Sequence, residues 1–539
     1  MRPTNIAIFH HHFNRGGVSR VVFSQLSALA KAIKSGQIKV AIFHGGREEI
    51  DPQLLQLIEQ WDLDLSTIPA LEYDAQRTDF STDDQLAQTI DTELAERSFD
   101  KSDTVLHFHN HSLGKNRALI PAINVLAKSG YRMLLQVHDM AEDFRAKNYA
   151  LLASGLPKLD CSMANVLPIA DHVHFGVINQ RDQTVLKTTG ISESSIHYLP
   201  NSVSSGGADE PLPDQKTAKQ KFADRNSIDP DVPLLLYPVR GIRRKNLGET
   251  ILLTLISRKP VCLGLTLAPA NPIELESFQR WKTLSSDLRL PVLFELGNQE
   301  GVSFTDNVAA ADAILTTSIA EGFGLVFLES FSFGKKLIGR DIPLITADFK
   351  QSGIQFDQLY SEIRIPIKLI NLADFDRQLK LEFNQTYADF GKSLDEKQYR
   401  SFLNQVVERG WIDFARLTTD QQRGVIIAAA RDPRVRTAIQ ESNVDVTDWI
   451  SGAASNDQDD SIRHNQSIIK DRYADTQTGD SLLSLYQQLI DAAVGEVSDN
   501  PKKFHPLQVE TPNAKSEKLE QETFRSIVKS SLKKIAPIP

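Results

Sequence analysis

The amino-acid sequence predicts an α/β protein with two Rossmann-like halves and an additional helical region towards its C-terminal end. Three observations predict this fold class. Short apolar runs alternate with longer amphipathic stretches, the alternation occurs in two series, and a polar stretch separates the series. Parallel strands joined by helices produce this pattern, because the helices cover both faces of the sheet. The 539 residues are also enough for several domains of about 150 residues each.

The first series begins with a strand, a helix over Val18–Ala32 and a second strand. Its expected strands are Asn5–Phe9, Lys39–Phe43, Thr104–Phe108, Met133–Val137, Val173–Ile178 and Ile196–Leu199. The polar stretch Ser204–Asp231 is interpreted as a linker. The second series then follows, with expected strands at Leu234–Tyr237, Val261–Leu265, Val292–Glu295, Ala313–Thr316 and Lys336–Ile338.

Beyond Phe349 the pattern becomes mainly helical, and a helix is expected at Ser481–Ala493. The predicted organisation is two Rossmann-like domains facing across a cleft, a mostly helical extension or insertion, a late helix and a loosely structured tail. The corresponding boundaries are 1–205, 232–350, 351–475, 476–495 and 496–539.

Composition excludes several classes of protein. Hydrophobic residues form 41% and charged residues 24% of the chain, as in soluble globular proteins. The net charge of −9 argues against a dedicated nucleic-acid binder. Cys161 and Cys262 form neither a disulfide framework nor a zinc motif. The sequence contains neither a signal-peptide core nor an apolar run of about 18 residues, so we expect a cytoplasmic protein.

Glycines and histidines mark the ends of the expected strands in the first half. Gly16 and Gly17 precede a helix, where they either let a diphosphate approach the backbone or simply form a turn. The GxGxxG and GxxxxGK fingerprints are missing, which argues against dehydrogenases and P-loop enzymes. His107, His109 and His111 alternate, and we favour a polar strand end that lines a cleft over a metal site.

The second half contains a basic cluster and an acidic, glycine-rich segment. The cluster, after the strand LLLYP, is formed by Arg240, Arg243, Arg244 and Lys245. Arg and Lys at a strand end suit a diphosphate, although a solvated basic turn is equally compatible. The segment EGFGLVFLE, residues 321–329, follows the strand AILTT and begins an apolar helix. Its two carboxylates, Glu321 and Glu329, are placed too differently to form an acid/base pair like that of a hydrolase.

The segment EGFGLVFLE resembles the E-x7-E signature of retaining glycosyltransferases of the GT-B fold, in glycosyltransferase family 4. Further elements occur in the same order, namely Gly16-Gly17, HFHNH, VHD, the NQRDQTVL run and Arg240 five residues before Lys245. SLLSLYQQL is similar to the closing helix of that family, which crosses back to the first domain. Asn246 departs from the pattern, because glycine is usual after the lysine.

The resemblance implies a role for each matched position. The first domain would be the acceptor side and the second would bind a nucleotide-diphosphate hexose with UDP, GDP or ADP, without an essential cofactor or metal. Gly16 and Gly17 would admit the diphosphate, Arg240 and Lys245 would neutralise it, and Glu329 would bind the ribose. The transferred sugar would meet Glu321, the backbone of Gly322, Phe323 and Gly324, and His138. The possible acceptor-side residues are His109, His111, Asp139 and Asn201.

The predicted activity is transfer of a hexose to a hydroxyl acceptor by a hexosyltransferase, with closure of the two domains during turnover. One rival is a GT-B-fold nucleotide-sugar epimerase or sugar phosphorylase, and another is a non-catalytic sugar-nucleotide-binding scaffold. In the tail, apolar residues between 524 and 535 form a stripe flanked by Lys and Arg. This stripe either packs on its own chain or contacts an anionic membrane or another protein.

Overall fold

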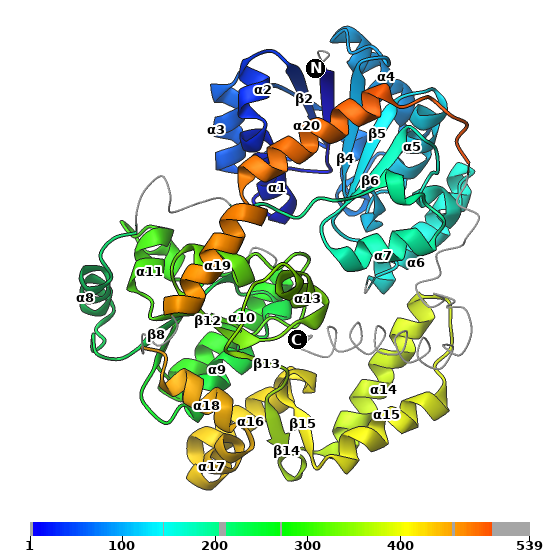
Figure 1. Cartoon of the computed structure of the whole chain (residues 1–539). Helices are drawn as coiled ribbons and strands as arrows, with labels where there is room; N and C mark the ends of the chain where they lie inside the picture. Colours follow the sequence, from blue (N-terminus) through cyan, green and yellow to red (C-terminus); the bar gives the residue numbers. More distant parts are fainter. Residues whose placement is uncertain (1–3, 144, 204–211, 270–271, 455–458, 499–539) are drawn as a thin grey trace. The chain divides into compact units, whose positions relative to one another are not determined.

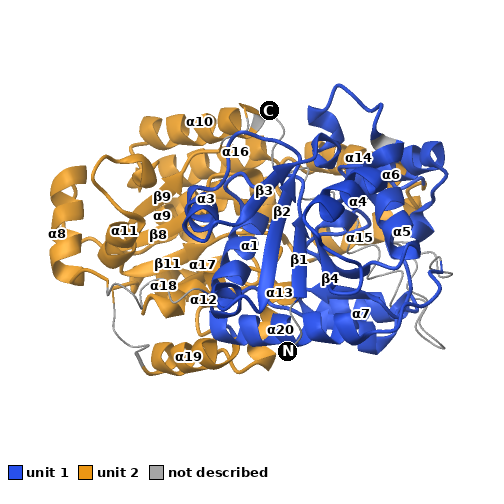
Figure 2. Cartoon of the chain, turned by 90° about the horizontal axis from the view of Figure 1, so that it is seen from above, with its two compact units in different colours: residues 1–204, 389–391, 473–526 blue, residues 205–388, 392–472, 527–539 orange. Residues whose placement is uncertain are grey.

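A computed structural model describes residues 4–143, 145–203, 212–269, 272–454 and 459–498. These residues form two compact units, coloured blue and orange in Figure 2. Unit 1 comprises residues 4–203, 389–391 and 473–498, and unit 2 comprises residues 212–388 and 392–472. Within these described ranges, the helices are all too short or too polar to cross a bilayer.

Unit 1 is built on a seven-stranded parallel sheet with the order β3-β2-β1-β4-β5-β6-β7. The strands are β1 Thr4–Phe9, β2 Ile38–His44, β3 Asp64–Thr67, β4 Thr104–His109, β5 Arg132–Val137, β6 Val173–Val177 and β7 Ile196–Tyr198. The six expected strands are confirmed. The sequence pattern missed β3, because this edge strand has half-buried and exposed residues and therefore no apolar run.

Helices cover both faces of the sheet of unit 1 (Figure 1). They are α1 Gly17–Ala28, α2 Ala30–Lys34, α3 Pro52–Gln60, α4 Leu86–Glu96, α5 Leu119–Lys128, α6 Ala146–Gly155, α7 Gln180–Thr188 and α20 Asp475–Asp491. The late helix α20 packs against α1 and β4 with Leu482, Leu485 and Leu489 buried. A Cβ at Gly479 would lie 2.5 Å from the carbonyl oxygen of Ala28, so the two helices approach closely there.

Unit 2 is built on a six-stranded parallel sheet with the order β10-β9-β8-β11-β12-β13, and an antiparallel ribbon of β14 and β15 accompanies it. The strands are β8 Leu234–Arg240, β9 Cys262–Leu267, β10 Val292–Leu293, β11 Ala313–Thr316, β12 Lys336–Arg340, β13 Leu359–Tyr360, β14 Arg364–Pro366 and β15 Trp411–Asp413. The five expected strands are confirmed. The sequence pattern missed β13, β14 and β15, which are short and lie beyond Phe349, where a mainly helical pattern is expected.

The helices of unit 2 include one in the stretch that we interpreted as a linker. They are α8 Gln215–Asn226, α9 Leu247–Ile256, α10 Pro272–Asp287, α11 Phe304–Ala310, α12 Val326–Ser332, α13 Pro343–Gln351, α14 Leu372–Asp389, α15 Glu396–Glu408, α16 Thr419–Arg431, α17 Pro433–Ser442, α18 Val444–Ser451 and α19 Asp459–Arg472. The linker interpretation is therefore wrong for α8. The side chain of Asp214 caps the N-terminus of this helix. Ala218 and Phe222, two of its few apolar residues, are buried.

The segment after residue 350 belongs to unit 2 as far as Arg472, except for residues 389–391, which belong to unit 1. It supplies β13–β15 and α14–α19, and it is joined to the sheet by an ion pair between Arg340 on β12 and Asp413 on β15. The apolar stripe expected between residues 524 and 535 lies outside the described residues.

Candidate functional site

The loops that follow β8 and β11 in unit 2 are held together at the carboxyl edge of the sheet. These strands are parallel neighbours, so their ends meet. The backbone N–H of Ile319 donates to the carbonyl of Arg244 over 2.9 Å. The carbonyl of Lys245 accepts hydrogen bonds from the hydroxyls of Thr317 (2.8 Å) and Tyr237 (3.0 Å). The lysine backbone is therefore fixed by both strands.

Two cations from the first loop contact the carboxylate of the second. The Lys245 ammonium and the Arg244 guanidinium each donate to Glu321. The side chains of Lys245 and Glu321 are buried, at 12% and 7% exposure, whereas that of Arg244 is 42% exposed. Burial by itself raises the pKa of Glu321, but Arg244 and Lys245 outweigh it and lower this pKa to about 2. Glu321 is therefore ionised at neutral pH.

Arg240 and Asn246 flank this contact in sequence. Arg240 ends β8, and its guanidinium has no hydrogen bond or ion pair with any described residue. Asn246 has a φ of 52°, in the left-handed region that favours glycine and also tolerates asparagine. This conformation restricts the position after Lys245 to glycine and the few other residues, such as asparagine, that tolerate it.

The segment 321–329 forms a turn that leads into α12. A Cβ atom added at Gly322 would meet nothing within 4 Å. Gly324 has a φ of 87°, and a Cβ atom added there would lie 2.8 Å from Cγ2 of Ile345. The ring of Phe323 is buried against Phe349 and is therefore not available to a ligand. Glu329 lies in the first turn of α12.

In unit 1, Gly16 and Gly17 lie where β1 passes into α1. Gly16 is extended and is the first residue before the helix, and Gly17 begins it. A Cβ at Gly17 would meet nothing within 4 Å. The protein alone therefore does not require a glycine at position 17, and the space beside it is open to a ligand.

His109 and His138 contact each other at the ends of β4 and β5. Nδ1 of His109 lies 3.1 Å from Nε2 of His138, and Nε2 of His109 is buried without a hydrogen-bond partner among the described residues. A buried N–H without an acceptor is rarer than an acceptor without a donor. We therefore assign the shared proton to His109 Nδ1, which donates to His138. Burial lowers the pKa of His138 to about 4, so a neutral His138 carries its own proton on Nδ1.

His111 does not continue the histidine row of β4, and the other two possible acceptor-side residues, Asp139 and Asn201, follow β5 and β7. Asn110 has a φ of 63° and ends the alternation, so His111 lies in a turn, where its Nε2 is 3.0 Å from the carbonyl oxygen of Val166. Asp139 forms an ion pair with Arg145. Asn201 follows β7, and its Oδ1 is buried without a partner in the described part of the chain.

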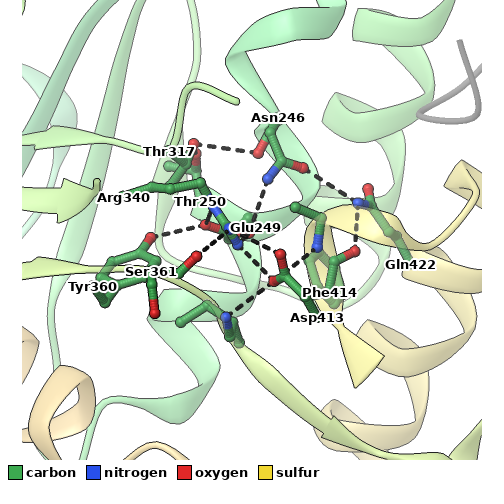
Figure 3. Close-up of polar contacts among 12 residues, drawn as sticks. Asn246, Glu249, Thr250, Thr317, Arg340, Tyr360, Ser361, Asp413, Phe414 and Gln422 are labelled. Atoms are coloured by element: carbon green, nitrogen blue, oxygen red, sulfur yellow. Dashed lines mark hydrogen bonds and ion pairs between the residues drawn. The ribbon is translucent and has the colours of Figure 1, made fainter. Parts of the chain in front are cut away.

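A buried ionic network, which no sequence motif indicates, adjoins the Lys245 loop (Figure 3). Arg340 donates to Glu249 (2.9 Å from Nε to Oε1) and to Asp413 (2.9 Å from Nη1 to Oδ2). Asn246 donates to Glu249 over 2.8 Å and accepts from Gln422 over 3.2 Å. The network therefore links the loop to the segment after residue 350. Its members are up to 176 residues apart in sequence, so no local motif could reveal it.

No group of three or more His, Cys, Asp or Glu side chains within the described ranges is placed to hold a metal ion. The alternating histidines of β4 are instead engaged by neutral partners. His107, for example, lies 2.9 Å from the hydroxyl of Tyr486 and 3.0 Å from the amide oxygen of Gln136.

The distribution of histidines predicts that acid destabilises unit 1. Eleven of the 13 histidines lie in its described part, against His464 in unit 2. Burial lowers the pKa of His138 and His111 to about 4 and that of His107 to about 3. The unfolded chain then binds more protons than the folded one between about pH 4 and pH 6.5, so the free energy of unfolding falls as pH falls through this range, by up to about 1.4 kcal/mol per pH unit for each such group.

Glu142 and Asp182 oppose this trend, since burial raises their pKa values to about 7 and about 6, but the lowered histidines outnumber them. Hydrogen exchange of peptides from β4 and β5 is expected to accelerate between about pH 7 and pH 5, after correction for the intrinsic rate. Peptides from β8 and β11 are the internal control. Equal acceleration in both units would contradict the prediction.

No protein-family model matches the sequence. The chain is 26% identical over 430 residues to mannosylglucosyl-3-phosphoglycerate synthase of Petrotoga mobilis, which covers 78% of this chain and 80% of that protein. Among solved structures, sucrose-phosphate synthase from Thermosynechococcus elongatus is similar with a TM-score of 0.52 and 14% identity, over 91% of this chain and 100% of that chain. A glycosyltransferase from Rickettsia africae is similar with a TM-score of 0.51 and 13% identity, over 91% of this chain and 100% of that chain.

These structures share the GT-B arrangement of two parallel-sheet α/β domains, and the predicted fold class is thereby confirmed. The similarity in sequence to a curated synthase, over most of both chains, supports a glycosyltransferase.

Proposed function

We propose that the protein is a retaining glycosyltransferase of family 4 that transfers a hexose from a nucleotide-diphosphate sugar to a hydroxyl group. The observation that carries the proposal is the contact of Lys245 and Arg244 with Glu321 at the carboxyl ends of β8 and β11. Ligands of open parallel sheets bind at this edge. Arg240, which ends β8 without a partner among the described residues, adds a further cation there.

The residues of unit 2 suit the departure of a nucleoside diphosphate. Cleavage of the sugar–phosphate bond develops positive charge on the anomeric carbon and negative charge on the leaving group. Fixed cations that face the leaving group lower this barrier, and we assign that role to Arg240 and Lys245. Before the donor binds, Glu321 neutralises Lys245 and keeps its ammonium in place. Glu329 is assigned to the ribose.

The sugar itself is assigned to Glu321, to the backbone at Gly322 and Gly324, and to His138. The open space beside Gly322 supports close approach of a ligand to the backbone. The hydrogen bond from His109 supports His138 as a donor through Nδ1 to a sugar hydroxyl. The departing phosphate would accept the proton of the incoming acceptor hydroxyl. The hydroxyl oxygen would bond to the anomeric carbon on the face that the phosphate leaves, so the anomeric configuration would be unchanged.

The name of the Petrotoga relative suggests the first substrates to test. It specifies a product with mannosyl, glucosyl and 3-phosphoglycerate groups. A mannosyl nucleotide as donor and glucosyl-3-phosphoglycerate as acceptor are therefore the first pair, followed by UDP-, GDP- and ADP-hexoses with other acceptors.

The test measures release of nucleoside diphosphate with and without acceptor, together with the anomeric configuration of the product by NMR. We expect release that depends on the acceptor and a product with the configuration of the donor. Inverted configuration would contradict the retaining mechanism. An epimerised donor, formed without acceptor, would instead identify an epimerase, and binding of nucleotide sugar without turnover would identify a scaffold.

A further inference from the structure

A group of basic and aromatic side chains surrounds Tyr73 at the carboxyl edge of the sheet in unit 1. The rings of His11 and His12 lie 4.9 Å and 5.0 Å from the Tyr73 ring, between centroids. The Lys115 ammonium lies 4.6 Å and the Arg47 guanidinium carbon 5.0 Å from the same centroid. These five residues, called the Tyr73 cluster below, follow β1, β2, β3 and β4 in the sequence. Four neighbouring strands therefore supply one site.

The charges of the Tyr73 cluster and its neighbours do not balance. Arg47 donates twice to Glu72, over 2.6 Å and 2.8 Å, and Arg145 pairs with Asp139. Lys115 has neither a hydrogen bond nor an ion pair from its ammonium to any described residue. One cation is therefore left without a partner. Burial lowers the pKa of Lys115, and Arg145 and Arg47 lower it further, so a bound anion would stabilise this ammonium.

The cluster also holds polar atoms that its own residues leave unsatisfied. Nε2 of His11 and Nδ1 of His12 are buried without a hydrogen-bond partner among the described residues. Burial, with the nearby Arg47, lowers the pKa of His12 to about 4. Burial raises the pKa of Tyr73 to about 12. At neutral pH the site therefore offers a neutral imidazole and a phenol that keeps its proton, beside the Lys115 cation.

A lysine elsewhere in unit 1 shows what a purely structural contact of this kind looks like. The Lys101 ammonium lies 4.8 Å from the Tyr131 ring, but it also has an ion pair with Asp91 at 3.7 Å. Lys101 precedes β4 and so lies at the opposite, amino edge of the sheet. Lys115 differs in both respects, since it has no carboxylate partner in the described chain and lies at the edge where ligands bind.

We infer that the Tyr73 cluster binds an anionic group, a phosphate or a carboxylate, of the acceptor. This inference rests on the proposed function, in which unit 2 supplies its own cations to the diphosphate of the donor and unit 1 receives the acceptor. Lys115 is the residue that forms the ion pair, and Arg47 and the two imidazoles line the site. The acceptor class is accordingly a hydroxyl compound with a phosphate or carboxylate, rather than a neutral sugar.

The experiment compares the wild-type full chain with Lys115→Met by calorimetry, with 3-phosphoglycerate, inorganic phosphate and a nucleoside diphosphate as separate probes. Methionine keeps most of the length of the side chain but removes the ammonium and its charge. Loss of a charge-assisted hydrogen bond is expected to weaken binding of the first two probes by about 10- to 100-fold. Affinity for the nucleoside diphosphate is expected to be unchanged. Lys115→Arg should retain anion binding, and Lys101→Met is the matched control.

Equal affinity of wild type and Lys115→Met for 3-phosphoglycerate and phosphate would overturn the inference, as would the absence of binding to the wild type. A selective loss of affinity for the nucleoside diphosphate would assign the cluster to the donor and also overturn it. The binding measurement needs no turnover. Failure of the proposed function, seen as no release of nucleoside diphosphate from any nucleotide sugar, is therefore distinct from failure of this inference.

Discussion

Replacement of Lys245 by methionine is expected to lower kcat by about 10²- to 10³-fold, the effect of removing one fixed group that stabilises transition-state charge. The side chain is buried, its carbonyl is fixed by Thr317 and Tyr237, and its ammonium contacts Glu321. Such a cation cannot be replaced by water or by a mobile neighbour. In the proposed reaction, negative charge on the diphosphate develops as the bond breaks, so kcat and kcat/KM should fall together.

The measurement is steady-state release of nucleoside diphosphate with saturating donor and acceptor. Lys380→Met is the control, because Lys380 forms an exposed ion pair with Glu396 on α15. Circular dichroism should show that both variants are folded. A Lys245→Met enzyme with the turnover of the wild type would remove Lys245 from the mechanism.

Replacement of Arg340 by methionine is expected to reduce the free energy of unfolding of unit 2 by about 3–5 kcal/mol. Arg340 is the common partner of two carboxylates, Glu249 with no exposed surface and Asp413 with 9% exposure (Figure 3). Without the guanidinium, both would be buried and without a cation. Burial raises the pKa of Glu249, and the charge and hydrogen bonds of Arg340 are the largest effects that oppose this shift.

Urea unfolding followed by tryptophan fluorescence measures this loss, since Trp281, Trp411 and Trp449 all lie in unit 2. The matched control is Arg434→Met, which breaks an exposed ion pair with Asp432 and should cost at most about 1 kcal/mol. The destabilisation by Arg340→Met should diminish as pH falls, because the freed carboxylates can then take up protons. Equal stability of the two variants would show that the network does not stabilise unit 2.

The Arg340 network also connects the segment after residue 350 to the Lys245 loop. Asp413 and Gln422 belong to this segment, and Gln422 donates to the side chain of Asn246, the neighbour of Lys245. The segment therefore helps to position the Lys245 loop. The side chain of Gln422 donates only to Asn246 and to the carbonyl of Phe414 among the described residues. We therefore expect a substitution of Gln422 to affect turnover only through the position of the Lys245 loop.

The sequence by itself determined the two α/β halves, eleven of their strands and the residues that carry the strongest motif. These features depend on local patterns, such as the apolar runs of β1 or β11 and the spacing from Arg240 to Lys245. The helix α8 was missed because its polar composition hides three buried residues, Ala218, Phe222 and Ala223.

Only the tertiary structure decided which charges meet. Lys245 and Glu321 are 76 residues apart, and Arg340 and Glu249 are 91 residues apart. Their contacts arise because parallel strands bring the ends of distant segments to one edge of a sheet. The structure likewise decided that His111 leaves the histidine row, and that Lys115 has no carboxylate partner in the described chain. Burial and pairing depend on all the neighbours of a side chain in space, and a local sequence pattern does not contain them.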